Sequence, residues 1–227
     1  MQNITQYIED MIADLRTSFG ARLLYVGLQG SYLRGEAKEG SDLDLMVVID
    51  ALTKDDLDLY RACLENRGDE IPSCGFLCGR EELSAWNPME ILHVLHSTKD
   101  LLGTLAPLLP AVTMEDHRHF VQLSAGNLYH ALCHRYVHGG EEGRAVSLGS
   151  HEKELYFLLS DLHYLRTADF PPTRNALYEV LPPCDRAVWD AVKEARDDPD
   201  GCEYDAAFAR VFAWCQSVLA EIGRDNA

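Results

Sequence analysis

The sequence predicts an α+β protein, with a mixed sheet and flanking helices in its N-terminal part and an α-helical bundle in its C-terminal part. Two strand-like apolar runs, RLLYVGLQ (22–29) and LDLMVVI (43–49), lie near the N-terminus. Beyond the Pro-rich stretch APLLPAV (106–112), the apolar residues recur at helical spacing. The change from strand-containing to purely helical sequence at this Pro-rich stretch predicts two domains, at 1–110 and 111–227.

The first helix is expected at residues 3–19. Ile4, Ile8, Ile12 and Leu15 recur at the spacing of one helix face. The strand-like run that follows ends at Gly30-Ser31. A turn-rich stretch then leads to the second strand-like run.

A second helix is expected to begin at Thr53, which has the residue type of an N-cap. Asp55 and Asp56 follow in the first turn, where acidic side chains stabilise a helix, and the helix is expected to run to about Arg67. The next elements expected are a strand at 73–79, a short helix at 81–86 and a helix from Pro88 to about Gly103.

The C-terminal part is expected to be helical throughout, with Gly, Pro and Asp residues separating the helices. The expected helices cover residues 113–138, 150–168, 173–181, 184–197 and 203–223.

Composition and charge exclude several classes of function. The 227 residues carry a formal net charge of -17, which argues against a nucleic-acid surface because phosphate binding needs a basic face. No apolar run is long enough to span a bilayer, and the acidic N-terminus lacks the features of a signal peptide. The seven cysteines, an odd number without paired zinc-ligand spacing, are interpreted as reduced thiols of a cytoplasmic protein.

The stretch GSYLRGEAKEGSDLDLMVV (30–48) contains the residues that indicate a chemical function. Asp42 and Asp44 are two apart at the start of a strand, so their carboxylates point to the same side and repel unless a cation lies between them. Mg²⁺ is the natural occupant of such an oxygen site. The upstream pair Gly30-Ser31 permits close approach of backbone N–H groups to phosphate oxygens. Together these features indicate phosphoryl transfer.

Each half of this pattern is common in proteins without such a function. A Gly-Ser turn is an ordinary connection, and Asp-x-Asp also occurs as a solvated strand start. Their joint occurrence between two strands favours the functional interpretation.

The same stretch resembles the signature of the DNA polymerase β-like nucleotidyltransferase superfamily, in its small bacterial form. The segment ELYFLLSDLHYLRTADFPPTRNAL (154–177) resembles, more distantly, the helical domain of aminoglycoside nucleotidyltransferases. The resemblance implies that Asp42 and Asp44 are catalytic residues that bind Mg²⁺. It further implies nucleotide-binding roles, with the triphosphate on Gly30 and Ser31, Arg34 near the phosphates or bracing the loop, and Ser41 supporting the metal turn.

Lys99 is a further nucleotide-binding candidate. It falls in the helix expected after Pro88, from which its ammonium group would reach the triphosphate. A solvated surface lysine is the alternative interpretation of this residue.

The predicted function is a Mg²⁺-dependent nucleotidyltransferase, which moves a nucleoside monophosphate from an NTP, expected to be ATP, to an acceptor hydroxyl. The acceptor is expected between the two domains. A strongly acidic protein favours a small cationic acceptor over a nucleic acid.

The sequence departs from the family pattern at the third carboxylate, which many members carry on the next strand. Here that strand reads SCGFLCG, and the expected position falls near Cys74, a residue type that ligates soft metals and is a poor Mg²⁺ ligand. An acid of the helical domain is one candidate to replace the missing carboxylate, and the nearby candidates are Asp69, Glu70, Glu81, Glu82 and Glu90. An alternative function therefore stays open, a non-catalytic nucleotide- or partner-binding module, such as an antitoxin-like regulator.

Overall fold

The computed structural model describes residues 4–68, 71–141 and 143–224. The chain divides into two compact units, Met1–Ala111 and Val112–Ala227, and the division lies in the Pro-rich stretch. The first unit combines a four-stranded sheet with helices, whereas the described part of the second unit contains helices and no strand. This architecture confirms the predicted α+β class.

The sheet of the first unit is mixed, with the strand order β3-β2-β1-β4. Its strands are β1 (Leu23–Leu28), β2 (Leu43–Ile49), β3 (Ser73–Gly79) and β4 (Lys99–Leu102). β2 pairs antiparallel with β1 and parallel with β3, and β4 pairs antiparallel with β1. Because of these directions, the C-terminal end of β1 and the N-terminal ends of the other three strands meet at one end of the sheet.

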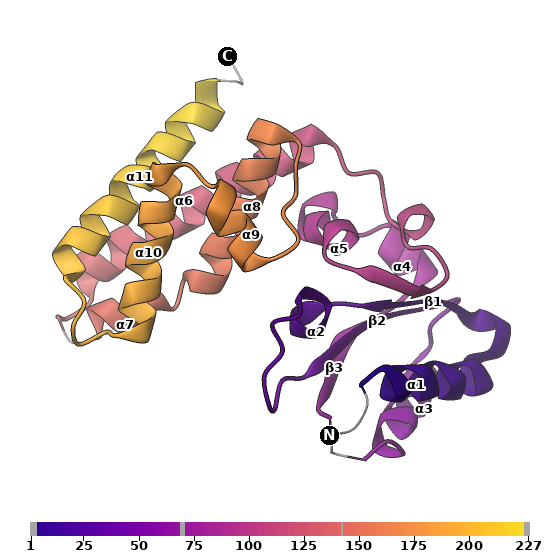
Figure 1. The fold of residues 1–227 in the computed structure, drawn as a ribbon. Coiled ribbons are helices and arrows are strands. Elements are labelled where there is room, and N and C mark those ends of the chain that lie inside the picture. The colour runs from indigo at the N-terminus through magenta and orange to yellow at the C-terminus, as the bar shows by residue number, and fades with distance from the viewer. Residues whose placement is uncertain (1–3, 69–70, 142, 225–227) are drawn as a thin grey trace. The chain divides into compact units, whose positions relative to one another are not determined.

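Both faces of β2 are buried, which explains why its sequence is almost continuously apolar. Leu45 and Val47 pack with residues of the flanking helices α1 and α3. Met46 and Val48 pack on the opposite face, in a core that includes residues of β1, β3 and α4. Figure 1 shows α1 and α3 together on one side of the sheet and α4 on the other. Asp44 shares the face of Met46, because residues two apart in a strand point to the same side.

The helices of the first unit are α1 (Ile4–Phe19), α2 (Gly30–Arg34), α3 (Lys54–Glu65), α4 (Arg80–Ser84) and α5 (Leu92–His96), with 3-10 turns at Gly20–Arg22, Pro88–Glu90 and Ala106–Leu108. Three of them, α1, α3 and α4, begin close to the positions that the sequence predicts.

The N-terminus of α3 is formed by a capping box, which confirms Thr53 as the N-cap. The Thr53 hydroxyl accepts a hydrogen bond from the Asp56 backbone N–H, and the Asp56 carboxylate accepts from the Thr53 backbone N–H at 2.8 Å. Arg22 donates to the same carboxylate at 2.6 and 3.0 Å, which ties α3 to the start of β1. The two bonds of the capping box satisfy two of the backbone donors that a helix start leaves open.

The expected helix from Pro88 to Gly103 is wrong. A 3-10 turn and α5 occupy the first part of this segment, and Lys99–Leu102 forms the edge strand β4. Pairing with β1 offers these residues backbone hydrogen bonds at an otherwise open sheet edge, and such tertiary pairing overrides local helix propensity. The Gly-Ser pair also differs from the expected turn, because it begins the short helix α2.

The second unit is a bundle of helices around one apolar core. Its helices are α6 (Met114–His138), α7 (Arg144–Gly149), α8 (Glu152–Thr167), α9 (Arg174–Val180), α10 (Pro183–Asp197) and α11 (Tyr204–Arg224). Five of them lie where the sequence predicts, and α7 was not predicted. The core brings together buried residues such as Leu128, Leu159, Val192, Val211 and Val218. Across the described residues, no helix is both long and apolar enough to pass through a membrane.

Candidate metal centre

The candidate site lies at the end of the sheet where β1 ends and β2 and β3 begin. The Gln29 backbone N–H, just after β1, donates to the Asp44 carbonyl at 2.9 Å. On the other side of β2, Asp44 lies directly opposite Cys74 in the parallel pairing with β3. The strand register therefore brings two distant parts of the sequence, at Gln29 and at Cys74, to Asp44.

Asp42, Asp44 and Cys74 form a cluster of possible metal ligands. One carboxylate oxygen from each aspartate and the Cys74 Sγ all lie within 4.8 Å of one another. Asp44 is half-buried, whereas Asp42 and Cys74 are exposed, so that ions can enter from solvent. Two carboxylates at this separation suit a hard divalent cation such as Mg²⁺, which commonly uses one or two carboxylates and completes its shell with water and phosphate oxygens.

Gly30 lies directly against the carboxylate of Asp44. Its backbone has a φ of +67°, a conformation that favours glycine, and a Cβ at this position would overlap Asp44 Oδ2. The glycine therefore lets the start of α2 approach the acidic cluster closely. This is the geometry expected if a backbone next to the ion must contact a phosphate group.

The segment that contains this cluster matches a known domain. Residues 9–74 match the family model described as "Nucleotidyltransferase domain", so the match spans α1 to the Cys74 position on β3. The N-terminal unit carries a nucleotidyltransferase domain. This assignment confirms the superfamily that the sequence predicts and, with it, the predicted class of enzyme, a nucleotidyltransferase.

The comparison with solved structures includes the following two matches. The spectinomycin adenyltransferase AAD(9) from Enterococcus faecialis, solved with ATP and spectinomycin, is 17% identical, with a TM-score of 0.57 over 96% of this chain and 100% of that one. This similarity shows a shared fold. A toxin-antitoxin structure with AMP-PNP is 20% identical over 56% of this chain and 92% of that one, with a TM-score of 0.32 that is too low to indicate a common fold. No curated protein matches this chain.

The other predicted nucleotide-binding residues near Gly30 lie in α2 and in the loop that leads from α2 to β2. Ser31 lies in the first turn of α2. Arg34, in its last turn, donates from Nε to the Glu36 carboxylate at 2.7 Å and braces the start of the loop. The Ser41 hydroxyl accepts from the Lys38 backbone N–H at 2.8 Å, which closes the turn just before Asp42.

Lys99 lies at the same end of the sheet as the acidic cluster, but its side chain is on the opposite face of the sheet. It pairs with Leu28 across β1, and Leu28 pairs with Leu45, so all three residues point to the face that α1 covers. Asp44 points to the opposite face. The register therefore does not support the predicted approach of Lys99 to a triphosphate beside Asp44.

The strand on which the resemblance places a third carboxylate is β3, and the residue of β3 that lies beside the two aspartates is Cys74. Among the described residues, no further acid or histidine joins the cluster. Glu81 and Glu82 lie in α4, beyond the far end of β3, and Glu90 accepts a hydrogen bond from the Trp86 indole at 2.8 Å. The other two candidates, Asp69 and Glu70, lie outside the described residues.

Asp100 is an acid that the sequence analysis missed, because it expected a helix there. β4 places it opposite Gly27 and thus on the face of Asp44, although it is not part of the cluster. It accepts a hydrogen bond from the Tyr25 hydroxyl at 2.7 Å. Burial, together with this bond, raises the pKa of Tyr25 well above its ordinary value, so Tyr25 acts as a donor at neutral pH.

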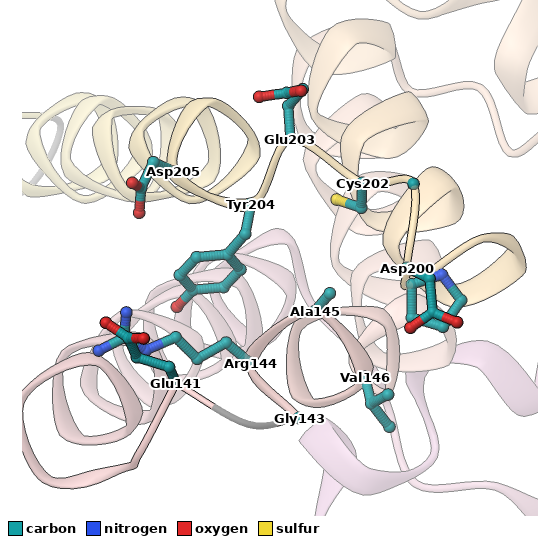
Figure 2. A pocket seen from close by; sticks show the side chains of 12 residues that line it. Glu141, Gly143, Arg144, Ala145, Val146, Asp200, Cys202, Glu203, Tyr204 and Asp205 are labelled. Carbon is teal, nitrogen blue, oxygen red and sulfur yellow. The ribbon is translucent and has the colours of Figure 1, made fainter.

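A surface hollow of about 650 Å³ lies elsewhere, entirely within the second unit. Figure 2 shows it between the start of α7 and the connection from α10 to α11. The guanidinium of Arg144 lies over the rings of Tyr136 and Tyr204, and several acids line the same hollow. The described residues that line the hollow include none of the predicted constellation, and its described acids do not belong to a cluster of possible metal ligands.

Replacing Gly30 with Ala is expected to disrupt the metal centre. The added methyl group would displace the Asp44 carboxylate. We expect Mg²⁺-dependent ATP binding to lose at least about 1.4 kcal/mol of binding free energy, which corresponds to a tenfold weaker affinity. Isothermal titration calorimetry measures this change.

Gly35→Ala is the matched control for this variant. Gly35 has nearly the same φ, +69°, but nothing lies within 4 Å of a Cβ built there. The Gly35→Ala variant should therefore lose about 1 kcal/mol of folding stability through backbone strain and keep its ATP affinity unchanged. Equal ATP affinity in the Gly30→Ala and Gly35→Ala variants would remove Gly30 from the site.

Proposed function

We propose that the chain transfers a nucleoside monophosphate from ATP to a hydroxyl group of an acceptor, with release of pyrophosphate. The observation that carries this proposal is the convergence of Asp42 and Asp44 against Gly30, at the end of the sheet in a nucleotidyltransferase domain. ATP is proposed as the donor because the structurally similar adenyltransferase was solved with ATP.

In this proposal Asp42 and Asp44 hold Mg²⁺, and the backbone at Gly30 and Ser31 holds the triphosphate. Bound Mg²⁺ would neutralise charge on the phosphate oxygens and favour displacement of pyrophosphate. The acceptor oxygen attacks the α-phosphorus, the bond from that phosphorus to the pyrophosphate oxygen breaks, and the hydroxyl proton is released. Ser41 and Arg34 contribute by holding the loop that carries Asp42.

The proposed acceptor is a small molecule with cationic amino groups. The formal net charge of -17 favours the approach of cations and disfavours nucleic acids. The presence of spectinomycin in the similar adenyltransferase structure supports the same class of acceptor.

A second candidate function is nucleotide binding without transfer. The observation that favours it is that the third member of the cluster is Cys74, a thiol, and not an acid that could bind a second metal or accept the hydroxyl proton. In this case the domain would bind ATP and Mg²⁺ and regulate a partner.

One experiment distinguishes the two functions. The purified chain is incubated with each labelled NTP and Mg²⁺ against a panel of aminoglycosides and aminocyclitols, and pyrophosphate release is measured beside calorimetric ATP binding. Acceptor-dependent release with ATP supports the transferase. ATP binding without release from any acceptor supports the binding module, and a failure to bind any NTP contradicts both.

A further inference from the structure

Cys74 lies near the position at which the family resemblance leads us to expect a third oxygen ligand. A thiol in place of a carboxylate changes the chemistry of the metal centre. The parallel register puts it directly opposite Asp44, so that the two side chains share one face of the sheet. Its Sγ lies within 4.8 Å of a carboxylate oxygen of both Asp42 and Asp44. The donor set is therefore two oxygens and one sulfur.

The neighbouring backbone keeps this sulfur close to the carboxylates. Gly75, the residue after Cys74, approaches β2 so closely that a Cβ at this position would overlap the Leu45 carbonyl oxygen. β3 is also an edge strand, and Cys74 is exposed. The thiol is thus held beside the two aspartates on a paired strand and is accessible to ions from solvent.

The donor set suits a different ion from the one that the aspartates alone would select. Mg²⁺ demands oxygen ligands at about 2.0–2.1 Å in octahedral geometry, and a thiolate is a poor ligand for it. Zn²⁺ accepts thiolate at about 2.3 Å and carboxylate at about 2.0–2.2 Å, most often with four ligands in tetrahedral geometry. Small side-chain rotations would bring the three donors to these distances, and water would supply the fourth ligand.

We propose that Asp42, Asp44 and Cys74 together form a mixed carboxylate–thiolate centre that binds Zn²⁺ or Co²⁺ more tightly than Mg²⁺. Cys74 thereby sets the metal preference of the nucleotidyltransferase domain. Occupation by Zn²⁺ would compete with the Mg²⁺ that the proposed transfer needs, which makes the activity sensitive to zinc. The inference rests on the proposed function only in taking Asp42 and Asp44 as metal ligands.

Co²⁺ is the probe for this centre, because bonding to a thiolate produces an intense near-ultraviolet absorption band that oxygen and nitrogen ligands do not produce. The full chain, reduced and free of nucleotide, is titrated with Co²⁺ alone. We expect the band to saturate at one ion per chain, to disappear when stoichiometric Zn²⁺ is added, and to persist in a hundredfold excess of Mg²⁺. The exposed histidine pair His134 and His138 on α6, with ring centroids 5.0 Å apart, would bind Co²⁺ without this band.

Two variants of Cys74 and one control complete the test. Cys74→Ser should lose the band, and Cys74→Asp should lose it and bind Mg²⁺ about 10- to 100-fold more tightly by calorimetry, because it restores an oxygen donor. The control is Cys184→Ser, which should keep the band. The Cys184 thiol is also exposed and lies 3.5 Å from Asp185 Oδ1, but that carboxylate already accepts hydrogen bonds from Arg166 and Trp214.

The outcomes separate this inference from the proposed function. A band that survives in Cys74→Ser, or that Mg²⁺ removes at equal concentration, overturns the inference. A chain that transfers nucleotides with Mg²⁺ but shows no Co²⁺–thiolate band refutes the mixed centre alone. A chain that shows the band through Cys74 yet transfers no nucleotide supports the centre and refutes only the proposed transfer.

Discussion

The Asp42→Asn variant is expected to lose nucleotide transfer by at least about a hundredfold while it keeps its fold. Removing one of two metal carboxylates weakens the charge stabilisation of the leaving pyrophosphate, which is worth several kcal/mol, and about 2.7 kcal/mol already corresponds to a hundredfold in rate. Asp42 is exposed and lies just before β2, so the substitution opens no cavity in the core. Pyrophosphate release under saturating ATP and Mg²⁺ measures the loss.

The same variant should also lose the stabilisation that Mg²⁺ and ATP give to the parent. A ligand at a hundred times its dissociation constant stabilises the folded state by about 2.7 kcal/mol, which raises the melting temperature of a chain of this size by roughly 5 °C or more. Without ligand, the variant should be as stable as the parent or slightly more stable, because it removes one of two like charges held close together. Thermal unfolding with and without Mg²⁺ and ATP tests both statements.

Asp58→Asn is the control for the loss of one negative charge. Asp58 is an exposed residue of α3 that pairs with Lys54 at 2.9 Å and with Arg61 at 3.5 Å. Surface pairs of this kind contribute about 0–1 kcal/mol, so activity and the response to Mg²⁺ should be unchanged. If Asp42→Asn is strongly destabilised, or still responds fully to Mg²⁺, Asp42 has a structural role and the proposed centre is wrong.

The Asp185→Ala variant is expected to destabilise the helical unit by about 2–4 kcal/mol. It removes a buried carboxylate that accepts two hydrogen bonds, each worth about 1.5–3 kcal/mol to a charged group, while Arg166 keeps Glu221 as a partner. Asp185 is 1% exposed and lies in the first turn of α10. Its carboxylate accepts from Arg166 Nη1 and from Trp214 Nε1, each at 2.7 Å, so it joins α10 to α8 and α11. The substitution would leave the buried indole N–H without this acceptor and would weaken the contact that orients Arg166.

Asp190→Ala is the matched control, since Asp190 belongs to the same helix. Its carboxylate accepts from the Tyr178 hydroxyl at 3.0 and 3.1 Å in an exposed setting, so its loss should cost less than about 1 kcal/mol. Urea unfolding followed by tryptophan fluorescence measures both variants, and Trp214 lies at the substituted contact. Comparable destabilisation by the two substitutions would show that the Asp185 network does not stabilise the bundle.

Much of the architecture could be predicted from residues close together in the sequence. Thr53 and Thr113 start helices through capping boxes that involve only the next three residues. Pro183 stands at the start of α10, where its missing N–H costs nothing. The apolar run of β2 identified a buried strand. The residues just before and at the start of this strand, Gly30, Asp42 and Asp44, formed the pattern that lies inside the matched domain. Such signals are local, so the sequence alone was enough to read them.

The tertiary structure decided which of these residues meet, and on which face of the sheet. Lys99 and Asp100 become a strand because β1 has an open edge, a fact that no local pattern contains. The register of β4 then sends Lys99 to one face and Asp100 to the other. The pairing of Asp44 with Cys74 depends on the alignment of β2 and β3, which are separated by a helix and loops. A shift of one residue in either pairing would move every side chain of that strand to the opposite face, so only the folded sheet determines the ligands of the metal centre.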